Sequence, residues 1–197
     1  MMWIGIGVVL AVYIGIRLYY FNRKITEAQR KGEQGEKEIR RQLSRLDRSK
    51  YTIINDVRFM IKGKVSQIDH IIVSDYGLFV IETKNYKGII YGDENSTYWK
   101  QVIYQYKNNF YNPIKQNLGH IYALNFVLRR LLTLNYFSFV VFTHRSQLKV
   151  KTMTPVVYPH QLIKKIKSQK TICISPALKR KIIQEIHVSN LNSKIRA

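Results

Sequence analysis

The stretch VSQIDHIIVSDYGLFVIETK, residues 65–84, decides the fold that the sequence predicts. Its two apolar runs flank the short segment DYG, a pattern typical of two strands joined by a tight turn. Charged residues interrupt both runs: Asp69 lies in the first, and Glu82 and Lys84 end the second. Because an unpartnered buried charge is strongly destabilising, these three side chains need partners.

Side chains alternate between the two faces of a strand, so Glu82 and Lys84 share a face. A two-residue loop of Asp75-Tyr76 sets Asp69 opposite Glu82, whereas a loop of Tyr76-Gly77 sets Asp69 opposite Lys84. Either register brings all three side chains to one face, with opposed Cβ atoms about 4.5–5.5 Å apart. A three-residue loop would break this arrangement.

Two carboxylates this close raise each other's pKa unless positive charge lies between them. Lys84 supplies part of that charge, and a divalent cation with open water positions, Mg²⁺ or Mn²⁺, would supply more. Such an ion can polarise a phosphodiester and position a water, while a neighbouring lysine orients or helps to deprotonate that water. The alternative is a buried ion pair of Lys84 with Asp69 or Glu82 that holds the sheet in register. Spacing alone does not separate the two.

The residues before this hairpin predict a helix over 24–46. Ile39, Leu43 and Leu46 recur at steps of three and four, which defines one apolar stripe. Extending the stripe backward by three residues reaches Glu36. Of the acids in GEQGEKE, Glu36 is therefore the one expected to face inward.

The rest of the chain predicts a mixed α/β layer. Asn112 and Pro113 are typical of a helix start, and this helix extends to about residue 132. We expect strands at 51–59, 88–92, 136–144 and 171–175, edge strands within 96–111, and helices at 161–169 and 176–187. Helix, antiparallel strands, then alternating helices and strands indicate the α/β class.

The charge balance points to a polyanionic partner. The chain has 33 Lys and Arg against 12 Asp and Glu, a formal net charge of +21. Such a field favours nucleic acid or an anionic membrane surface, and the alternative is a basic but merely solvated surface. A hydrophobic content of 46% excludes a disordered basic tail. The single cysteine, Cys173, fits a reducing compartment, and we expect it to be a small core residue within the 171–175 strand.

The N-terminal segment, residues 1–22, predicts a transmembrane anchor. Through Phe21 it is apolar apart from Arg17, which would extend toward the headgroups, and a span needs roughly 20 residues. Basic residues follow the segment, so the positive-inside rule predicts a single-pass protein of the cell membrane whose C-terminal domain is cytoplasmic. The alternative is a buried hydrophobic helix.

The central stretch QIDHIIVSDYGLFVIETKNYKG resembles the motif of the nuclease-related domain (NERD) family, part of the PD-(D/E)xK nuclease superfamily. GEQGEKEIRRQL resembles the family's N-terminal glycine-glutamate helix, and NPIKQNLGHIYAL its later asparagine-proline-glutamine helix. The resemblance covers roughly residues 32–130. The literal Pro-Asp of the superfamily is absent, since Ile68 precedes Asp69, but NERD sequences commonly read this way.

The resemblance implies a restriction-endonuclease-like mixed sheet flanked by helices, and it implies roles for five residues. Asp69, Glu82 and Lys84 would form the catalytic core, Glu36 would be an additional acid near the metal, and Gln116 a supporting polar residue. The implied metal ligands are Asp69, Glu82 and Glu36, and the implied ion is Mg²⁺ or Mn²⁺.

Five further polar residues are candidates for contacts with nucleic acid: Gln67, Asn85, Lys87, Lys100 and Lys107. Each has an ordinary structural alternative, namely a satisfied strand glutamine or a solvated loop or surface residue. The aromatic residues interleaved with the last two lysines would stack bases or, equally, pack between edge strands and core. These are Tyr98, Trp99, Tyr104, Tyr106, Phe110 and Tyr111.

Two histidines lie close to the motifs. His70 is expected on the face opposite Asp69, as a core or partner-bonded histidine. His120 follows Gln116 by one helical turn and so can approach the site, but a structural role is favoured over a functional one.

The sequence thus predicts a membrane-anchored, metal-dependent nuclease that hydrolyses phosphodiester bonds, in DNA rather than RNA. Its parts are an anchor over 1–22 and a nuclease-like domain over 23–197, with a motif-bearing core at about 32–130 and a basic α/β extension over 133–197. The alternatives are a non-catalytic nucleic-acid-binding or membrane-scaffold protein on a nuclease-like fold, and a lipid-binding adaptor. A homo-oligomer is also compatible with the sequence.

Overall fold

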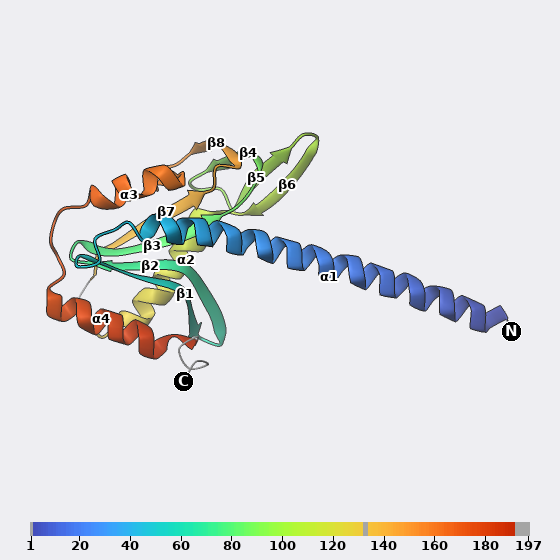
Figure 1. Cartoon of the computed structure of the whole chain (residues 1–197), viewed down its shortest axis with the longest axis horizontal. Helices are drawn as coiled ribbons and strands as arrows, with labels where there is room; N and C mark the ends of the chain where they lie inside the picture. Colours follow the sequence, from blue (N-terminus) through green and yellow to red (C-terminus); the bar gives the residue numbers. More distant parts are fainter. Residues whose placement is uncertain (1, 132–133, 192–197) are drawn as a thin grey trace. The chain divides into compact units, whose positions relative to one another are not determined.

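The computed structural model describes residues 2–131 and 134–191 of the 197-residue chain, without the side chains of residues 2–12, 21 and 24. It divides into two compact units, Met1–Gln34 and Gly35–Ala197. The first unit consists of the N-terminal part of a long helix, α1 (Met2–Leu43). The second is the α/β domain (Figure 1).

In the part of the chain that the structure describes, no helix combines the length and hydropathy needed to cross a bilayer. The prediction of a transmembrane helix over 1–22 is therefore not supported. α1 runs through this segment, but Arg17 interrupts its apolar residues and the basic residues Arg23 and Lys24 follow closely. Met1 lies outside the described residues.

The first sheet has the order β1-β2-β3-β7-β9. Its first three strands are antiparallel neighbours, and β3, β7 and β9 are parallel. Since a parallel connection needs a crossover, β7 returns beside β3 only after three strands of the second sheet and one helix have intervened. The strands span Tyr51–Ile61, Lys64–Ser74, Gly77–Lys84, Tyr136–Phe142 and Val156–Val157.

The second sheet has the order β6-β5-β4-β8, with antiparallel pairs except for the parallel pair of β4 and β8. The strands β4, β5, β6 and β8 span Gly88–Asp93, Tyr98–Ile103, Tyr106–Tyr111 and Ser146–Lys151. Only Asn85, Tyr86 and Lys87 separate β4 from the end of β3, so the second sheet starts next to the last charged residue of the motif.

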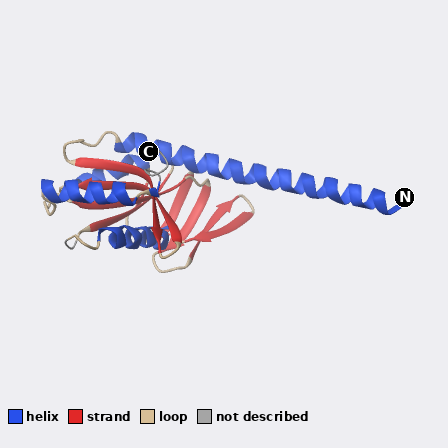
Figure 2. Ribbon diagram, turned by 90° about the horizontal axis from the view of Figure 1, so that it is seen from below, coloured by secondary structure: helices blue, strands red, loops and turns tan. Residues whose placement is uncertain are grey.

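Helices cover both faces of the first sheet (Figure 2). One face packs against α2 and α4, and the opposite face packs against the end of α1 and against α3. A third cluster, built around Trp99, joins the second sheet to β7 and α2. The helices α2, α3 and α4 span Pro113–Leu128, Pro159–Lys167 and Pro176–Ser189.

The start of α2 is fixed by the predicted cap. The side-chain oxygen of Asn112 accepts from the backbone N–H of Ile114 at 2.9 Å, and Pro113 occupies the first turn. The amide nitrogen of Asn112 donates to backbone oxygens in the loop that joins β4 and β5, at 2.7 Å for Ser96. The cap therefore ties α2 to the second sheet while the body of the helix packs on the first.

Several sequence predictions agree with this fold. The class is mixed α/β, with two mixed sheets flanked by helices. The β2–β3 turn uses the two-residue loop Asp75-Tyr76, since Ser74 pairs with Gly77. The stripe of Ile39, Leu43 and Leu46 is buried, although the helix itself ends at Leu43.

Other predictions were wrong. Residues 171–175 form no strand, and Cys173 is exposed rather than a core residue. The backbone N–H groups of Cys173 and Ile174 both donate to the carbonyl of Asp75, a contact with a turn rather than a ladder. The strands β8 and β9 were not predicted, because the first is half exposed and the second has two residues.

Candidate active site

The β2–β3 hairpin brings the motif acids to one place. Its ladder runs from Ser74–Gly77 to His70–Ile81, so the next position in the same register sets Asp69 opposite Glu82. There Asp69 Oδ2 accepts a hydrogen bond from the backbone N–H of Thr83 at 2.8 Å. The carboxylate of Asp69 thus satisfies the backbone N–H of Thr83 at the position where the backbone pairing of β2 with β3 ends.

Glu82 is almost completely buried, at 2% exposure, and both of its oxygens are engaged. Oε1 lies 2.7 Å from Lys84 Nζ, and Oε2 lies 3.1 Å from His120 Nε2. Lys84 Nζ also donates to Gln116 Oε1 at 2.9 Å. The end of β3 and one face of α2 therefore form a connected polar network.

His120 holds Glu82 from the side of α2. A carboxylate oxygen only accepts, so the Nε2 atom of His120 carries a proton. Its Nδ1 atom lies 3.1 Å from the hydroxyl of Ser66, which can donate to a neutral ring. This histidine is buried, at 9% exposure, and its orientation is fixed at both nitrogens. It was predicted to be structural, yet it contacts a motif carboxylate directly.

Asn117 fixes the position of α2 on the first sheet through its side-chain hydrogen bonds. Its side-chain nitrogen donates to the carbonyl of Val80 at 2.8 Å, to the hydroxyl of Ser138 at 2.8 Å and to the carbonyl of Phe139 at 3.2 Å. These bonds join the helix to β3 and β7. Gln116 and His120, one turn apart, are thereby directed at the end of β3. The four-residue spacing of Gln116 and His120 was the signal in the sequence that both side chains lie on one face of α2.

The charges of the site are unevenly balanced. Burial, the charge of Glu82 and, to a lesser extent, that of Glu36 raise the pKa of Asp69 to about 8. Burial alone would raise the pKa of Glu82, but the contacts with His120 and Lys84 outweigh it and the net shift is downward. Burial alone would lower the pKa of Lys84, but the Glu82 carboxylate outweighs it and the net shift is upward. Glu82 and Lys84 are thus a charged pair, while Asp69 retains a proton at neutral pH.

The end of α1 approaches the site through Gly35. A Cβ atom at Gly35 would lie 2.8 Å from the Cβ of Asn85, closer than real Cβ atoms come. The glycine therefore lets the helix pass against the residue that follows Lys84. Glu36, the next residue, is half-buried and lies near enough for its charge to raise the pKa of Asp69. This supports the expectation that Glu36 is the inward-facing acid.

The predicted metal ligands are of the chemical type that the cation prefers, but their arrangement is not a ready binding site. Asp69, Glu82 and Glu36 are carboxylates, the ligands that Mg²⁺ and Mn²⁺ prefer. Within the described ranges, no group of three or more His, Cys, Asp or Glu side chains forms a ready metal-binding cluster. Both oxygens of Glu82 contact Lys84 and His120. Binding would therefore require Glu82 to exchange one of these contacts.

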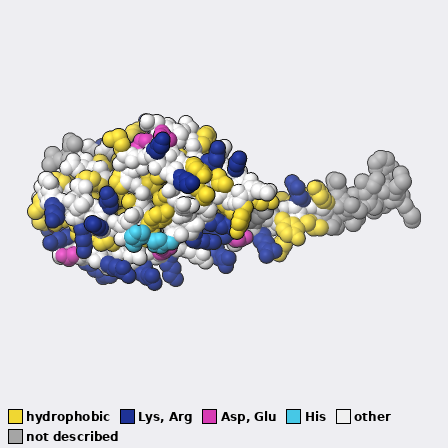
Figure 3. Space-filling model, turned by 90° about the horizontal axis from the view of Figure 1, so that it is seen from above, with side chains coloured by type: hydrophobic (Ala, Val, Ile, Leu, Met, Phe, Trp, Pro, Cys, Tyr) yellow, Lys and Arg dark blue, Asp and Glu magenta, His cyan; other side chains and the backbone are white. Residues whose placement is uncertain are grey.

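The predicted contacts with nucleic acid divide into two groups. Asn85 is half-buried, and its Oδ1 accepts from the hydroxyl of Thr143 at 2.7 Å. Gln67 is exposed and donates to Asp56 at 3.0 Å. The lysines at 87, 100 and 107 are exposed, the first in the loop after β3 and the other two on the second sheet. Lys and Arg side chains are spread widely over the face of the α/β domain drawn in Figure 3.

His70 lies on the face opposite Asp69, as predicted. It is fully buried, and its Nδ1 donates to Asn55 Oδ1 at 2.7 Å. Burial, followed by the nearby charge of Arg40, lowers the pKa of His70 to about 4. The ring is therefore neutral at physiological pH and belongs to the packing between β2 and α1.

Comparison with known proteins gives results consistent with this geometry. A protein of Bacillus anthracis that is described as uncharacterized is 43% identical over 103 residues, which cover 52% of this chain and 49% of that protein. The chain thus spans about half the length of this relative. No solved structure matches the chain. The family model of the nuclease-related domain matches residues 31–143, more than half of the chain and all of the residues that line the candidate site. The chain belongs to the nuclease-related domain (NERD) family.

Proposed function

We propose that the domain Gly35–Ala197 is a metal-dependent nuclease that hydrolyses phosphodiester bonds, in DNA rather than RNA. The observation that carries the proposal is the convergence of Asp69, Glu82 and Lys84 at the end of the β2–β3 hairpin, with Glu82 buried and paired with the half-buried Lys84. Membership of a family within the PD-(D/E)xK superfamily supports it, and so does the mixed α/β fold with helices on both faces of the first sheet.

Asp69, Glu82 and Glu36 are the residues that would hold Mg²⁺ or Mn²⁺. Bound there, the ion would polarise the phosphodiester and bring a water to it. The raised pKa of Asp69 supports this assignment, because it reflects burial first and then the negative charge of Glu82, which Lys84 alone does not balance. Asp69 would give up its proton on becoming a ligand.

Lys84 is assigned to charge stabilisation. Since the Glu82 carboxylate raises its pKa, Lys84 remains an ammonium group at neutral pH and is a poor proton acceptor. Its fixed position between Glu82 and Gln116 suits it to orient a water and to stabilise the negative charge that develops on phosphate. Gln116 and His120 act through Lys84 and Glu82 and are positioning residues.

The net charge of +21 would supply attraction to phosphates that does not depend on sequence. Lys87 is placed for this role, since it follows Lys84 by three residues and is exposed. Asn85, bonded to Thr143, is left out of the proposed contacts.

The test is cleavage of supercoiled plasmid DNA by the full-length protein with Mg²⁺, with Mn²⁺ or with a chelator, and of RNA under the same conditions. We expect metal-dependent cleavage that is lost in Glu82→Gln and in Lys84→Ala, while both variants still bind DNA. Circular dichroism would verify that each variant is folded. Glu185→Gln, a change on the exposed side of α4, is the matched control. Undiminished metal-dependent cleavage by both site variants would overturn the proposal.

A second candidate is a nucleic-acid-binding protein without catalysis on the same fold. It is favoured by one observation, the engagement of both Glu82 oxygens by Lys84 and His120, which leaves the buried carboxylate balanced without a metal. DNA binding without cleavage under every metal condition would establish this candidate in place of the first.

A further inference from the structure

The second sheet has two faces of opposite character. One face is buried: Ile90 and Trp99 are 0% and 1% exposed, and Trp99 stacks on Phe142 of β7 at 6.1 Å between ring centroids. Phe110 and Leu148 lie on the same face. The residues that alternate with these point away from the core, and on each of the four strands most of them are exposed.

This outer face carries tyrosines and lysines side by side. The register places Tyr91 opposite Lys100 on β5 and opposite Lys149 on β8. We call the surface the tyrosine–lysine face and define it by the following residues. Its tyrosines are Tyr91, Tyr98 and Tyr111, which are 40%, 63% and 48% exposed. Its lysines are Lys100, Lys107, Lys149 and Lys151, all exposed.

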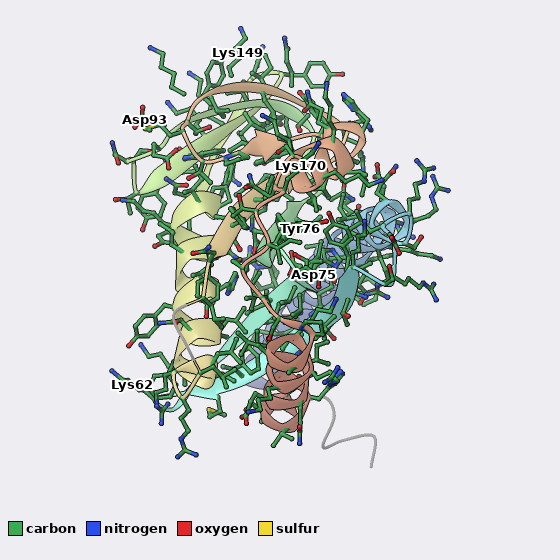
Figure 4. All side chains as sticks on the ribbon, turned by 90° about the vertical axis from the view of Figure 1, so that its left-hand side faces the viewer. Lys62, Asp75, Tyr76, Asp93, Lys149 and Lys170 are labelled. Carbon is green, nitrogen blue, oxygen red and sulfur yellow. The ribbon has the colours of Figure 1, made fainter. Side chains whose placement is uncertain are left out.

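The pairs on this face are close. Tyr98 and Tyr111 are register partners with ring centroids 6.3 Å apart, and Lys149 Nζ lies 5.7 Å from the ring centroid of Tyr91. Asp93 is an acid on the same face, and its register partner is Lys151. Lys149 of β8 and Asp93 of β4 are labelled beside this sheet in the upper part of Figure 4. The face thus combines exposed rings with a net positive charge.

We propose that the tyrosine–lysine face binds single-stranded nucleic acid, with bases stacked on the tyrosines and phosphates attracted by the lysines. Exposed aromatic rings that alternate with cations are what such a ligand requires, because every unpaired base offers a flat face and every nucleotide a negative charge. In a duplex the bases are already stacked on one another, so only the lysines of this face would be used.

The position of this face extends the proposed function by naming the substrate class. β4 begins four residues after Lys84, a path of about 14 Å at most, and the amide of Gln101 donates to the carbonyl of Lys87 in the connecting loop at 2.9 Å. A single strand of nucleic acid bound on the tyrosine–lysine face would therefore reach the end of β3. The preference for single-stranded substrates rests on the proposed nuclease function, whereas the binding itself does not.

Binding is tested with the full-length protein in chelator, by fluorescence anisotropy. The probes are labelled thymidine oligonucleotides of about 20 nucleotides, longer than one binding module covers, together with the matching oligouridine and a duplex of equal length. We expect the single strand to bind more tightly than the duplex. Tyr98→Ala/Tyr111→Ala should weaken single-strand binding by about 10-fold or more, and duplex binding far less. Lys100→Ala should lower the slope of log affinity against log salt by about 0.7.

Two controls separate stacking from folding effects. Tyr122→Ala removes a tyrosine of similar exposure, 56%, from α2 and should leave binding unchanged. Tyr98→Phe/Tyr111→Phe keeps the rings and should retain affinity. Tyr98→Thr/Tyr111→Thr replaces the alanine pair if that pair does not fold, since threonine suits a strand. Equal affinities for the thymidine and uridine oligonucleotides would show that base stacking, and not the sugar, determines which single strand binds.

The proposal would be overturned by unchanged single-strand affinity in the tyrosine double variant. It would also be overturned if that variant lost binding to vesicles containing phosphatidylglycerol while its oligonucleotide affinity stayed the same, which would identify a lipid surface instead. Single-strand binding at this face without metal-dependent cleavage would sustain the inference and refute the proposed nuclease. Metal-dependent cleavage together with unchanged single-strand affinity in the tyrosine double variant would sustain the proposed nuclease and refute this inference.

Discussion

The two sheets depart from the usual distribution of side chains in opposite directions. In the first sheet, β3 buries charge: Glu82 is 2% exposed and pairs with Lys84. In the second sheet, β5 exposes a ring: Tyr98 is 63% exposed, while the next residue, Trp99, is 1% exposed. Charged residues are rarely buried unless paired, and a set of exposed rings on one face is equally uncommon.

The difference lies in where the partners come from. The buried charge of β3 is balanced within the chain, by Lys84 and by His120 from α2, so the arrangement is complete before any ligand arrives. The rings of the second sheet contact one another and a lysine, and a large part of their surface still faces solvent. Departures from the ordinary pattern concentrate where proteins act, and here they coincide with the candidate active site and with the proposed binding face.

The largest effect is expected at Asp69. We predict that Asp69→Asn lowers metal-dependent cleavage by at least about 100-fold, the usual cost of removing a group that acts on developing charge. The same change should leave the free energy of unfolding at pH 7 unchanged or higher. The reason is that burial and Glu82 raise the pKa of Asp69 to about 8, so the carboxyl group is mostly neutral already and asparagine can still accept from Thr83.

Plasmid cleavage and urea denaturation of the same preparation would measure both quantities. Asp47→Asn, in the turn after α1, is the control, because the Asp47 carboxylate accepts from the backbone N–H and the hydroxyl of nearby Ser49 and lies outside the candidate site. A marked fall in the stability of Asp69→Asn would show that the site is built for structure and would remove the contrast drawn between the sheets.

The part of this contrast that lies in local sequence could be predicted. The alternation in QIDHIIV and LFVIETK defined the hairpin and the shared face of its three charges, and the stripe through Ile39 and Leu43 identified Glu36. The contact of His120 with Glu82 was not predicted, because the two residues lie 38 positions apart in the chain. Lys149 and Lys151 could not be assigned to the tyrosine–lysine face, because they lie on β8, which pairs with β4 across more than 50 residues. Periodicity carries no information on such pairings.

The next effect concerns the neutral histidine behind the site. Burial lowers the pKa of His70 from 6.5 to about 4, so the unfolded chain binds a proton in this range that the folded protein does not. Stability should therefore be complete above about pH 6.5 and fall by about 3 kcal/mol as the pH drops to 4. Urea denaturation at several pH values measures this loss. His70→Gln should reduce it and His160→Gln, at an exposed position, should not; equal losses in both would assign the acid sensitivity elsewhere.

The smallest effect is expected at Tyr98, on the exposed face of the second sheet. Tyr98→Ala should change the free energy of unfolding by less than about 1 kcal/mol, because an exposed cross-strand pair contributes little. Trp99→Ala, one residue away, should cost about 3–5 kcal/mol, since its indole fills the cluster with Phe142. Thermal and urea denaturation would compare the two. If Tyr98 proved as important for stability as Trp99, its ring would be part of the packing, and the exposed face would lose its claim to a ligand.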